Sequence, residues 1–132
     1  MFLKPRPQRR PRAASSGKRA WMYKDPGQRA DEARMTAAMS AYRPARPLEG
    51  PLRLSFVAAF PWPVSIPARR RAGAAHVRKP DLDNLAKFLM DCLQAARFMA
   101  DDRQVTEISA RKTYTDGPGW WTVELGPERG GL

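Results

Sequence analysis

The chain has 132 residues and a formal net charge of +11, with 24 lysines and arginines against 13 aspartates and glutamates. This length suits one domain with a modest core and is too short for two domains. A single cysteine, Cys92, and a single histidine, His76, exclude an internal disulfide framework and a zinc site built from Cys and His.

The excess of positive charge predicts a polyanionic partner, because polyanions attract and concentrate such a protein. Nucleic acid is the first candidate and an acidic membrane surface is the second. Positive charge kept only for solubility is the remaining explanation. No apolar run approaches the ~20 residues that cross a bilayer, and the basic N-terminus lacks the apolar stretch of a secretory signal. We therefore expect a cytoplasmic protein with no membrane partner.

Residues 1–24 form a basic, proline-rich segment without a single acid. Pro5, Pro7 and Pro11 exclude a regular helix there. We expect an extended or partly disordered arm with room for a short strand, although a solubilising tail fits the same composition. The candidates for phosphate contacts in this arm are Arg9, Arg10 and Arg12.

A helix is predicted to follow the arm. Asp25 is its expected N-cap, Pro26 suits the first helical position, and Pro44 closes the element. A half-buried strand is predicted over residues 51–60, because apolar and polar side chains alternate in LRLSF.

Residues 61–80, PWPVSIPARRRAGAAHVRKP, are proline-rich and then cationic, and they predict a long loop. Long loops in small domains commonly bind ligands, and this one directly precedes a group of acids. We expect its cations to contact a DNA backbone rather than merely to be solvated. These cations are Arg69, Arg70, Arg71, Arg78 and Lys79.

A second helix is predicted in DLDNLAKFLMDCLQAA, where apolar residues fall on one arc of roughly 120°. The members of this arc are Leu82, Leu85, Ala86, Leu89, Cys92, Leu93 and Ala96. Asp83, Lys87 and Asp91 form an i, i+4, i+8 ridge on the polar side.

Two further strands are predicted over residues 104–114 and 120–125, separated by the turn TDGPG. The order of elements indicates an α+β fold, a single small domain with two main helices packed on a small mixed or antiparallel sheet. Residues 25–126 are expected to form this domain and residues 127–132 a C-terminal tail.

Five of the thirteen acids gather in the stretch RKPDLDNLAKFLMDCLQAARFMADD. They are Asp81, Asp83, Asp91, Asp101 and Asp102. Each alone has an ordinary explanation, such as N-capping, an i, i+4 ion pair of Asp83 with Lys87, or a turn. Together they repel one another, and Lys87 alone cannot neutralise them.

A divalent cation reconciles these acids with the surrounding positive charge. Mg²⁺ takes oxygen ligands, usually one or two carboxylates together with water and substrate phosphate oxygens. Such an ion activates a water for in-line attack on a phosphodiester and stabilises the departing 3′ oxygen, while Lys87 is placed to stabilise charge on the phosphorus oxygens. The pattern alone leaves two functions equally open: metal-dependent phosphodiester cleavage, and nucleic-acid binding by a non-catalytic basic protein.

The order of these residues resembles the RusA family of Holliday-junction resolvases, which are common in bacterial and phage genomes. The resemblance runs through KPDLDNLAKFLMDCLQ (residues 79–94) and ADDRQV (residues 100–105). The basic N-terminus and the closing KTY and WWTVEL resemble family members more loosely. Asp-x-Asp alone is a weak motif, but DLDNLxxK followed by a paired Asp is a specific one.

The resemblance implies a homodimeric, Mg²⁺-dependent endonuclease of DNA recombination and repair, with Mn²⁺ as a substitute ion and no organic cofactor. It would nick two opposed strands of a four-way DNA junction, whose two-fold symmetry suits a dimer. By matched position, Asp81, Asp83 and Asp102 are the implied metal-binding catalytic acids, with Asp101 as the next candidate. Lys87 is the implied supporting catalytic cation.

The resemblance also places residues 25–126 as the nuclease domain of a bacterial or phage-encoded protein. A nuclease for flaps or other branched DNA is a further alternative. Family members often carry a Gly between the second helix and the Asp pair, but QAARFMADD has none. Another residue must therefore cap the end of this helix.

Overall fold

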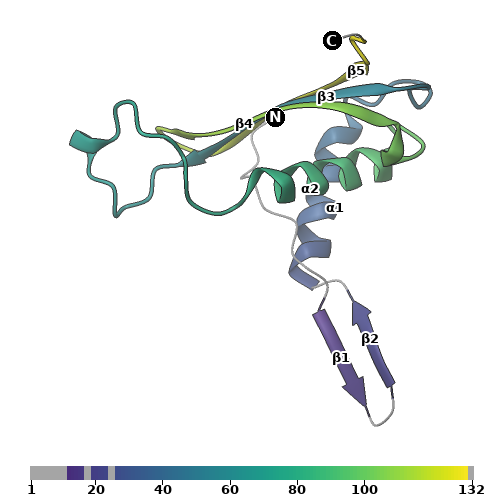
Figure 1. Ribbon diagram of the computed structural model, residues 1–132, viewed down its shortest axis with the longest axis horizontal. Helices are drawn as coiled ribbons and strands as arrows, with labels where there is room; N and C mark the ends of the chain where they lie inside the picture. Colours follow the sequence, from purple (N-terminus) through teal and green to yellow (C-terminus); the bar gives the residue numbers. More distant parts are fainter. Residues whose placement is uncertain (1–11, 17–18, 24–25, 131–132) are drawn as a thin grey trace.

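The computed structural model describes residues 12–16, 19–23 and 26–130, with side chains described from residue 31 onward. A β-hairpin and a helix precede the main sheet (Figure 1). The elements are β1 (Arg12–Ser16), β2 (Arg19–Tyr23), α1 (Pro26–Ser40), β3 (Leu52–Pro61), η1 (Ala68–Arg70), α2 (Leu82–Ala95), η2 (Asp102–Gln104), β4 (Val105–Thr115) and β5 (Trp120–Pro127), where η marks a 3₁₀ turn.

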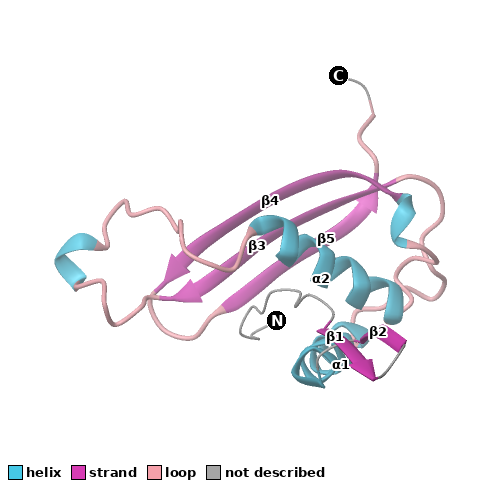
Figure 2. Ribbon diagram, turned by 60° about the horizontal axis from the view of Figure 1, so that its bottom comes forward, coloured by secondary structure: helices cyan, strands magenta, loops and turns pink. Residues whose placement is uncertain are grey.

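The main sheet has three strands in the order β4-β3-β5. β3 runs parallel to β4 and antiparallel to β5. A parallel pair needs a crossover connection, and here the long loop and α2 supply it. Both helices lie on the same face of the sheet (Figures 1 and 2). The predicted α+β domain, two helices on a small mixed sheet, is confirmed.

The core lies between this sheet and α2. β3 buries Leu52, Leu54 and Phe56 in alternation with half-buried neighbours, as a strand with one covered face requires. Its neighbours β4 and β5 begin and end within two residues of their predicted bounds. Trp121 of β5 is buried against Phe56, with ring centroids 5.9 Å apart.

The apolar face of α2 differs from the predicted arc at two positions. Leu82 is 37% exposed, whereas Phe88, which the arc left out, is only 2% exposed. Phe88 stacks on Trp121 of β5, with ring centroids 6.2 Å apart. The buried face is displaced because α2 packs against the sheet on one side and against α1 on the other.

α1 begins at Pro26 as predicted, while its expected N-cap Asp25 lies outside the described residues. Met35 and Met39 are buried at its contact with α2. The helix ends at Ser40, before the predicted stop at Pro44. Tyr42, beyond this end, is largely exposed.

The N-terminal arm contains two strands rather than one. β1 and β2 pair antiparallel, with Arg12 opposite Tyr23. Residues 1–11, which include the candidate phosphate contacts Arg9 and Arg10, lie outside the described residues. Within the described ranges, neither helix combines the length and apolar character required to span a bilayer.

Candidate nuclease site

Lys87 forms ion pairs with two acids that come from different elements of the chain. Its Nζ atom lies 3.1 Å from Asp91 Oδ1, one turn further along α2, and 3.1 Å from Asp102 Oδ2, at the start of η2. The i, i+4 pair that forms on the α2 ridge is therefore Lys87–Asp91, not the pair with Asp83 considered from the sequence. The candidate catalytic cation and one candidate metal-binding acid thus lie in direct contact.

The two carboxylates also set the protonation state of Lys87. Hydrogen bonds to Asp91 and then to Asp102 raise the pKa of the ammonium above its ordinary range, against a small opposing effect of burial. Lys87 therefore stays charged at neutral pH. Half of its side chain is exposed to solvent.

Asp101 has a structural role in this region. Its carboxylate accepts hydrogen bonds from Arg103 N (2.9 Å) and Arg103 Nε (3.1 Å), and it forms a capping box with Gln104 around η2. The backbone N–H of Arg103, followed by its side chain, lowers the pKa of Asp101. Asp101 and Asp102 are thus each held by a cation, Arg103 and Lys87 respectively.

Two glutamines that the sequence analysis did not single out hold the Asp101–Asp102 backbone. Gln94 Oε1 on α2 accepts from the N–H of Asp102 at 3.0 Å. Gln104 Oε1 accepts from the N–H groups of Ala100 and Asp101, while its Nε2 donates to the carbonyls of Leu48 and Gly50. The capping-box spacing in DDRQ is a sequence signal that finds Gln104; Gln94 has no such signal.

Asp81 and Asp83 lie at the start of α2, with exposed side chains. Asp81 occupies the N-cap position in an extended conformation, φ −76° and ψ 151°, yet its carboxylate makes no capping hydrogen bond. Asp83 Oδ1 accepts from the adjacent N–H of Asn84 at 3.0 Å. The capping explanation considered for Asp81 is therefore not met.

The spacing of the acidic side chains limits how a divalent ion can be bound. Among the residues whose side chains are described, no group of three or more His, Cys, Asp or Glu lies close enough to hold a metal ion. Asp102 is neutralised by Lys87 instead. The exposed oxygen donors fit an ion held by one or two carboxylates together with water and phosphate oxygens, and not a closed protein cage.

The cations of the predicted loop lie on the segment between β3 and α2. Arg69 and Arg70 are exposed on η1, and Lys79 is exposed just before Asp81. Arg71 is tied down instead: its Nε donates to the Ile66 carbonyl, and its guanidinium lies 5.5 Å from the Trp62 ring centroid. Arg78 donates to Ser65 Oγ at 2.9 Å.

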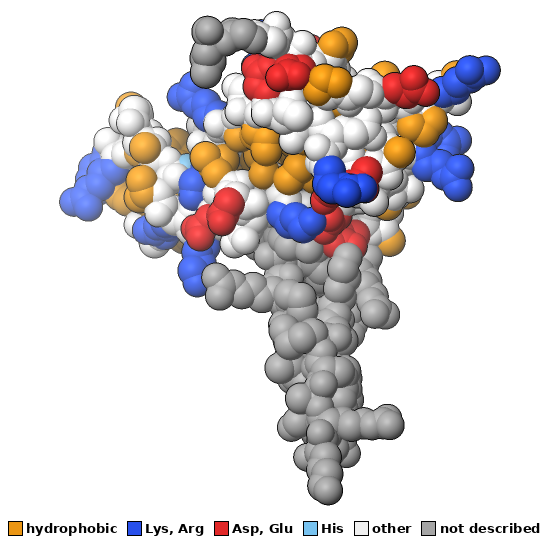
Figure 3. Space-filling view, turned by 45° about the vertical axis from the view of Figure 1, so that its right-hand side comes forward, with side chains coloured by type: hydrophobic (Ala, Val, Ile, Leu, Met, Phe, Trp, Pro, Cys, Tyr) orange, Lys and Arg blue, Asp and Glu red, His pale blue; other side chains and the backbone are white. Residues whose placement is uncertain are grey.

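In the space-filling view, lysine and arginine side chains are spread over the face shown and include several at the end formed by this loop (Figure 3). Acidic and basic side chains lie next to one another on the same face (Figure 3). On this face, positive charge that can attract a DNA backbone lies close to carboxylates that can attract a cation.

An aromatic stack holds the predicted long loop to the sheet. Tyr114 of β4 stacks on Trp62 on one side and on His76 on the other, with ring centroids 4.3 Å apart in each pair. His76 also meets Phe60 edge-on at 4.8 Å and is only 8% exposed. His76 is therefore packed against the sheet.

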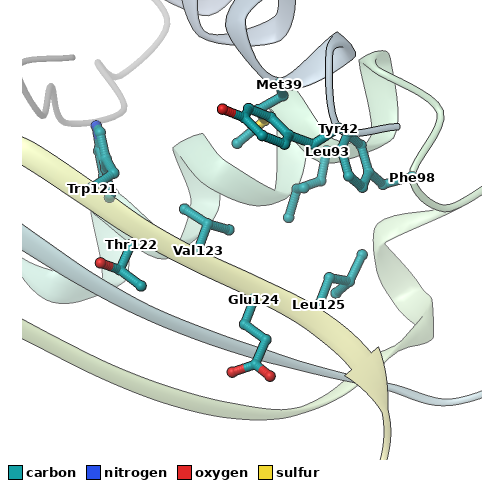
Figure 4. A pocket seen from close by; sticks show the side chains of 9 residues that line it. All are labelled: Met39, Tyr42, Leu93, Phe98, Trp121, Thr122, Val123, Glu124 and Leu125. Atoms are coloured by element: carbon teal, nitrogen blue, oxygen red, sulfur yellow. The ribbon is translucent and has the colours of Figure 1, made fainter. Parts of the chain in front are cut away.

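An apolar groove of about 500 Å³ lies elsewhere, between α1, α2 and β5 (Figure 4). It is lined mainly by apolar and aromatic side chains, with Glu124 as its one acid. None of the predicted site residues lines this groove, and its mainly apolar surface does not suit a charged phosphodiester. Its lining residues are Met39, Tyr42, Leu93, Phe98, Trp121, Thr122, Val123, Glu124 and Leu125.

The sequence was also compared with known proteins. No curated protein matches the chain. The sequence model of one family, described as Endodeoxyribonuclease RusA, matches residues 3–124. That range covers both strands of the hairpin, both helices and the acidic region. The chain therefore belongs to the RusA family of endodeoxyribonucleases.

Proposed function

We propose that this protein resolves four-way DNA junctions by paired, Mg²⁺-dependent nicks in DNA recombination and repair, acting as a homodimer. Membership of the RusA family supports endonuclease activity on branched DNA. The observation that carries the proposal for this chain is the contact of Lys87 with Asp102, at 3.1 Å across fifteen residues of sequence. It joins the implied catalytic cation and an implied catalytic acid from two different elements.

Asp81, Asp83 and Asp102 are the proposed ligands of the divalent ion, with Mn²⁺ as a substitute for Mg²⁺. Because no three acids form a ready group among the described side chains, water and phosphate oxygens would complete the coordination. An ion bound there supplies an activated water and stabilises charge on the departing 3′ oxygen. Asp83 and Lys87 project from α2, so the rigid helix fixes their spacing. The charged ammonium of Lys87 is placed to stabilise the negative charge that builds on the phosphorus oxygens.

The exposed cations of the loop supply the affinity for the DNA backbone in this proposal. Arg69, Arg70 and Lys79 precede the acids along the chain and are open to solvent. Contacts of this kind position the duplex arms without reading their sequence. A two-fold dimer would present two such sites to the two opposed strands of a junction.

The replacement Asp81→Asn tests the metal site. It removes one negative ligand while keeping the size of the side chain. We expect Mg²⁺-dependent cleavage of a synthetic four-way junction to fall at least about 100-fold, because loss of a metal ligand removes several kcal/mol of transition-state stabilisation. Junction binding, measured in Ca²⁺ or without metal, should persist or tighten because a negative charge has gone.

Asp116→Asn is the matched control, since Asp116 is an exposed acid in the turn between β4 and β5. It should cut like the unmodified protein. Normal cutting by Asp81→Asn would remove Asp81 from the metal site. Absence of cleavage by the unmodified protein with any divalent ion would instead favour a non-catalytic binding protein, and preference for flaps would favour another branched substrate. A monomer on the bound junction in sedimentation would contradict paired cutting.

A further inference from the structure

Lys112 of β4 contacts the backbone just before the acids rather than another charged side chain. Its Nζ donates to the carbonyl oxygen of Arg78 at 2.7 Å and to that of Pro80 at 3.0 Å. Lys112 is half-buried, and it lies 34 and 32 residues away from these partners in the sequence. Hydrogen bonds from a charged donor are shorter and stronger than those between neutral groups.

The position of these carbonyls matters because α2 does not fix Asp81 by itself. Asp81 precedes the first helical residue, has extended backbone angles and makes no side-chain capping bond. Its own carbonyl accepts from Leu85 N at 3.1 Å, while the carbonyl of Pro80 accepts from Lys112. The Asp81 backbone is therefore held on its helix side by α2 and on its loop side by Lys112.

β4 holds the loop at a second point on the same side of the strand. Tyr114 follows Lys112 by two residues, the spacing that returns to the same face of a strand. It is Tyr114 that stacks between Trp62, at the beginning of the loop, and His76, near its end. The two side chains together fasten the loop to the sheet along its path to Asp81.

We propose that Lys112 is a positioning residue for Asp81, acting through the carbonyls of Arg78 and Pro80. The proposal rests on the proposed function, in which Asp81 helps to hold a divalent ion. A ligand that stands outside the helix needs its backbone fixed, since a displacement of about 1 Å costs catalysis roughly 100-fold in a well-formed site. Lys112 supplies this constraint without touching the ion or the DNA.

The competing explanation is that Lys112 is one more cation that contacts the phosphates of DNA. Its ammonium is already committed to two carbonyls, which does not suit a phosphate contact. Arg111, the preceding residue, is exposed and belongs to the opposite face of β4. Arg111 is therefore a matched control for Lys112. Each residue carries one positive charge, but of the two it is Lys112 that contacts the carbonyls.

Lys112→Met and Arg111→Met provide the test, with both variants compared in the full chain. The first readout is backbone amide exchange at Leu85, whose N–H donates to the Asp81 carbonyl at 3.1 Å, measured without DNA or metal. We expect exchange there to accelerate by at least about tenfold in Lys112→Met and to stay unchanged in Arg111→Met. This readout needs no activity, so it tests the contact even if the proposed function fails.

The second readout is junction cleavage. At saturating junction, Lys112→Met should cut at least about tenfold more slowly and need more Mg²⁺, with junction affinity changed by less than about twofold. Arg111→Met should cut at the unmodified rate. Lys112→Arg, which keeps the charge and several donors, should restore slow exchange and most of the cleavage.

Unchanged amide exchange in Lys112→Met would overturn the proposal. So would equal reductions of junction affinity in Lys112→Met and Arg111→Met with unchanged rates at saturation, because that result describes a DNA-binding cation. If the unmodified protein cuts no junction, the proposed function is wrong, and the exchange result still decides whether Lys112 fixes the backbone before Asp81.

Discussion

At the scale of single residues, the acidic region of this basic protein is balanced by nearby cations. Lys87 lies between Asp91 and Asp102, and Arg103 pairs with Asp101 at 3.0 Å. Exposed pairs of this kind contribute little to folding. These pairs therefore fix the positions of the acidic side chains more than they stabilise the fold.

His76 is the residue whose titration should be visible in the stability of the protein. Burial, then the charges of Lys112 and Arg78, lower its pKa below the ordinary value of about 6.5. The groups that face it are the rings of Phe60 and Tyr114 and these two cations. A histidine with a lowered pKa stabilises the fold above the pKa of the unfolded state, and this contribution is lost as the pH falls.

We therefore predict that His76→Phe makes the protein less sensitive to acid between pH 7 and pH 5. Phenylalanine keeps a ring against Tyr114 and Phe60 but takes up no proton. The measurement is the free energy of unfolding in urea at both pH values, for both proteins. An equal loss of stability in the two proteins over this range would show that His76 does not titrate as its surroundings imply.

At the scale of elements, the end of α2 shows how the chain replaces the glycine that is often found in the family. The N–H of Phe98 donates to the carbonyl of Leu93 and the N–H of Arg97 to that of Gln94, which is the Schellman arrangement. Arg97 takes the left-handed position with φ 64°. That conformation costs an L-residue about 1–2 kcal/mol, whereas glycine adopts it freely.

Arg97→Gly is accordingly expected to stabilise the protein by about 0.5–1 kcal/mol, after the loss of freedom that glycine suffers on folding. Ala95→Gly, two residues earlier, is the matched control: Ala95 is helical and exposed, so glycine should destabilise there by about 0.5 kcal/mol. Urea unfolding of the two variants measures both changes. Destabilisation by Arg97→Gly would mean that Arg97 makes a favourable contact worth more than the backbone strain.

At the scale of the whole molecule, the net charge is +11. Part of this positive charge lies on the exposed basic loop at one end of the sheet. Salt weakens the binding of DNA in proportion to the number of phosphates that a protein neutralises. The exposed pair on η1, Arg69 and Arg70, should account for part of this dependence because both side chains are open to solvent.

The double variant Arg69→Ala/Arg70→Ala should lower the slope of log Kd against log salt concentration by about 2 units, one for each phosphate that the variant no longer neutralises. Arg129→Ala is the control, because Arg129 follows β5 at the opposite end of the sheet, where its N–H donates to Glu107. Junction binding titrated at several salt concentrations gives both slopes. An unchanged slope in the double variant would exclude η1 from the DNA surface.

The sequence by itself determined the elements and the family. Period-two alternation marked the buried face of β3, and the helical arc marked most of the buried face of α2, because both patterns depend only on local backbone geometry. The motif around DLDN and ADD was specific enough to indicate the RusA family, which the match over residues 3–124 confirms. The assignment of Asp81, Asp83 and Asp102 to a metal remains a prediction.

Only the tertiary structure decided which side chains meet. Lys87 pairs with Asp102 rather than with Asp83, His76 is packed against Tyr114, and Lys112 reaches the carbonyls before Asp81. Leu82 was placed in the core wrongly for the same reason. Contacts across many residues depend on the path that the parallel β3–β4 crossover imposes on the chain, and no local spacing records that path.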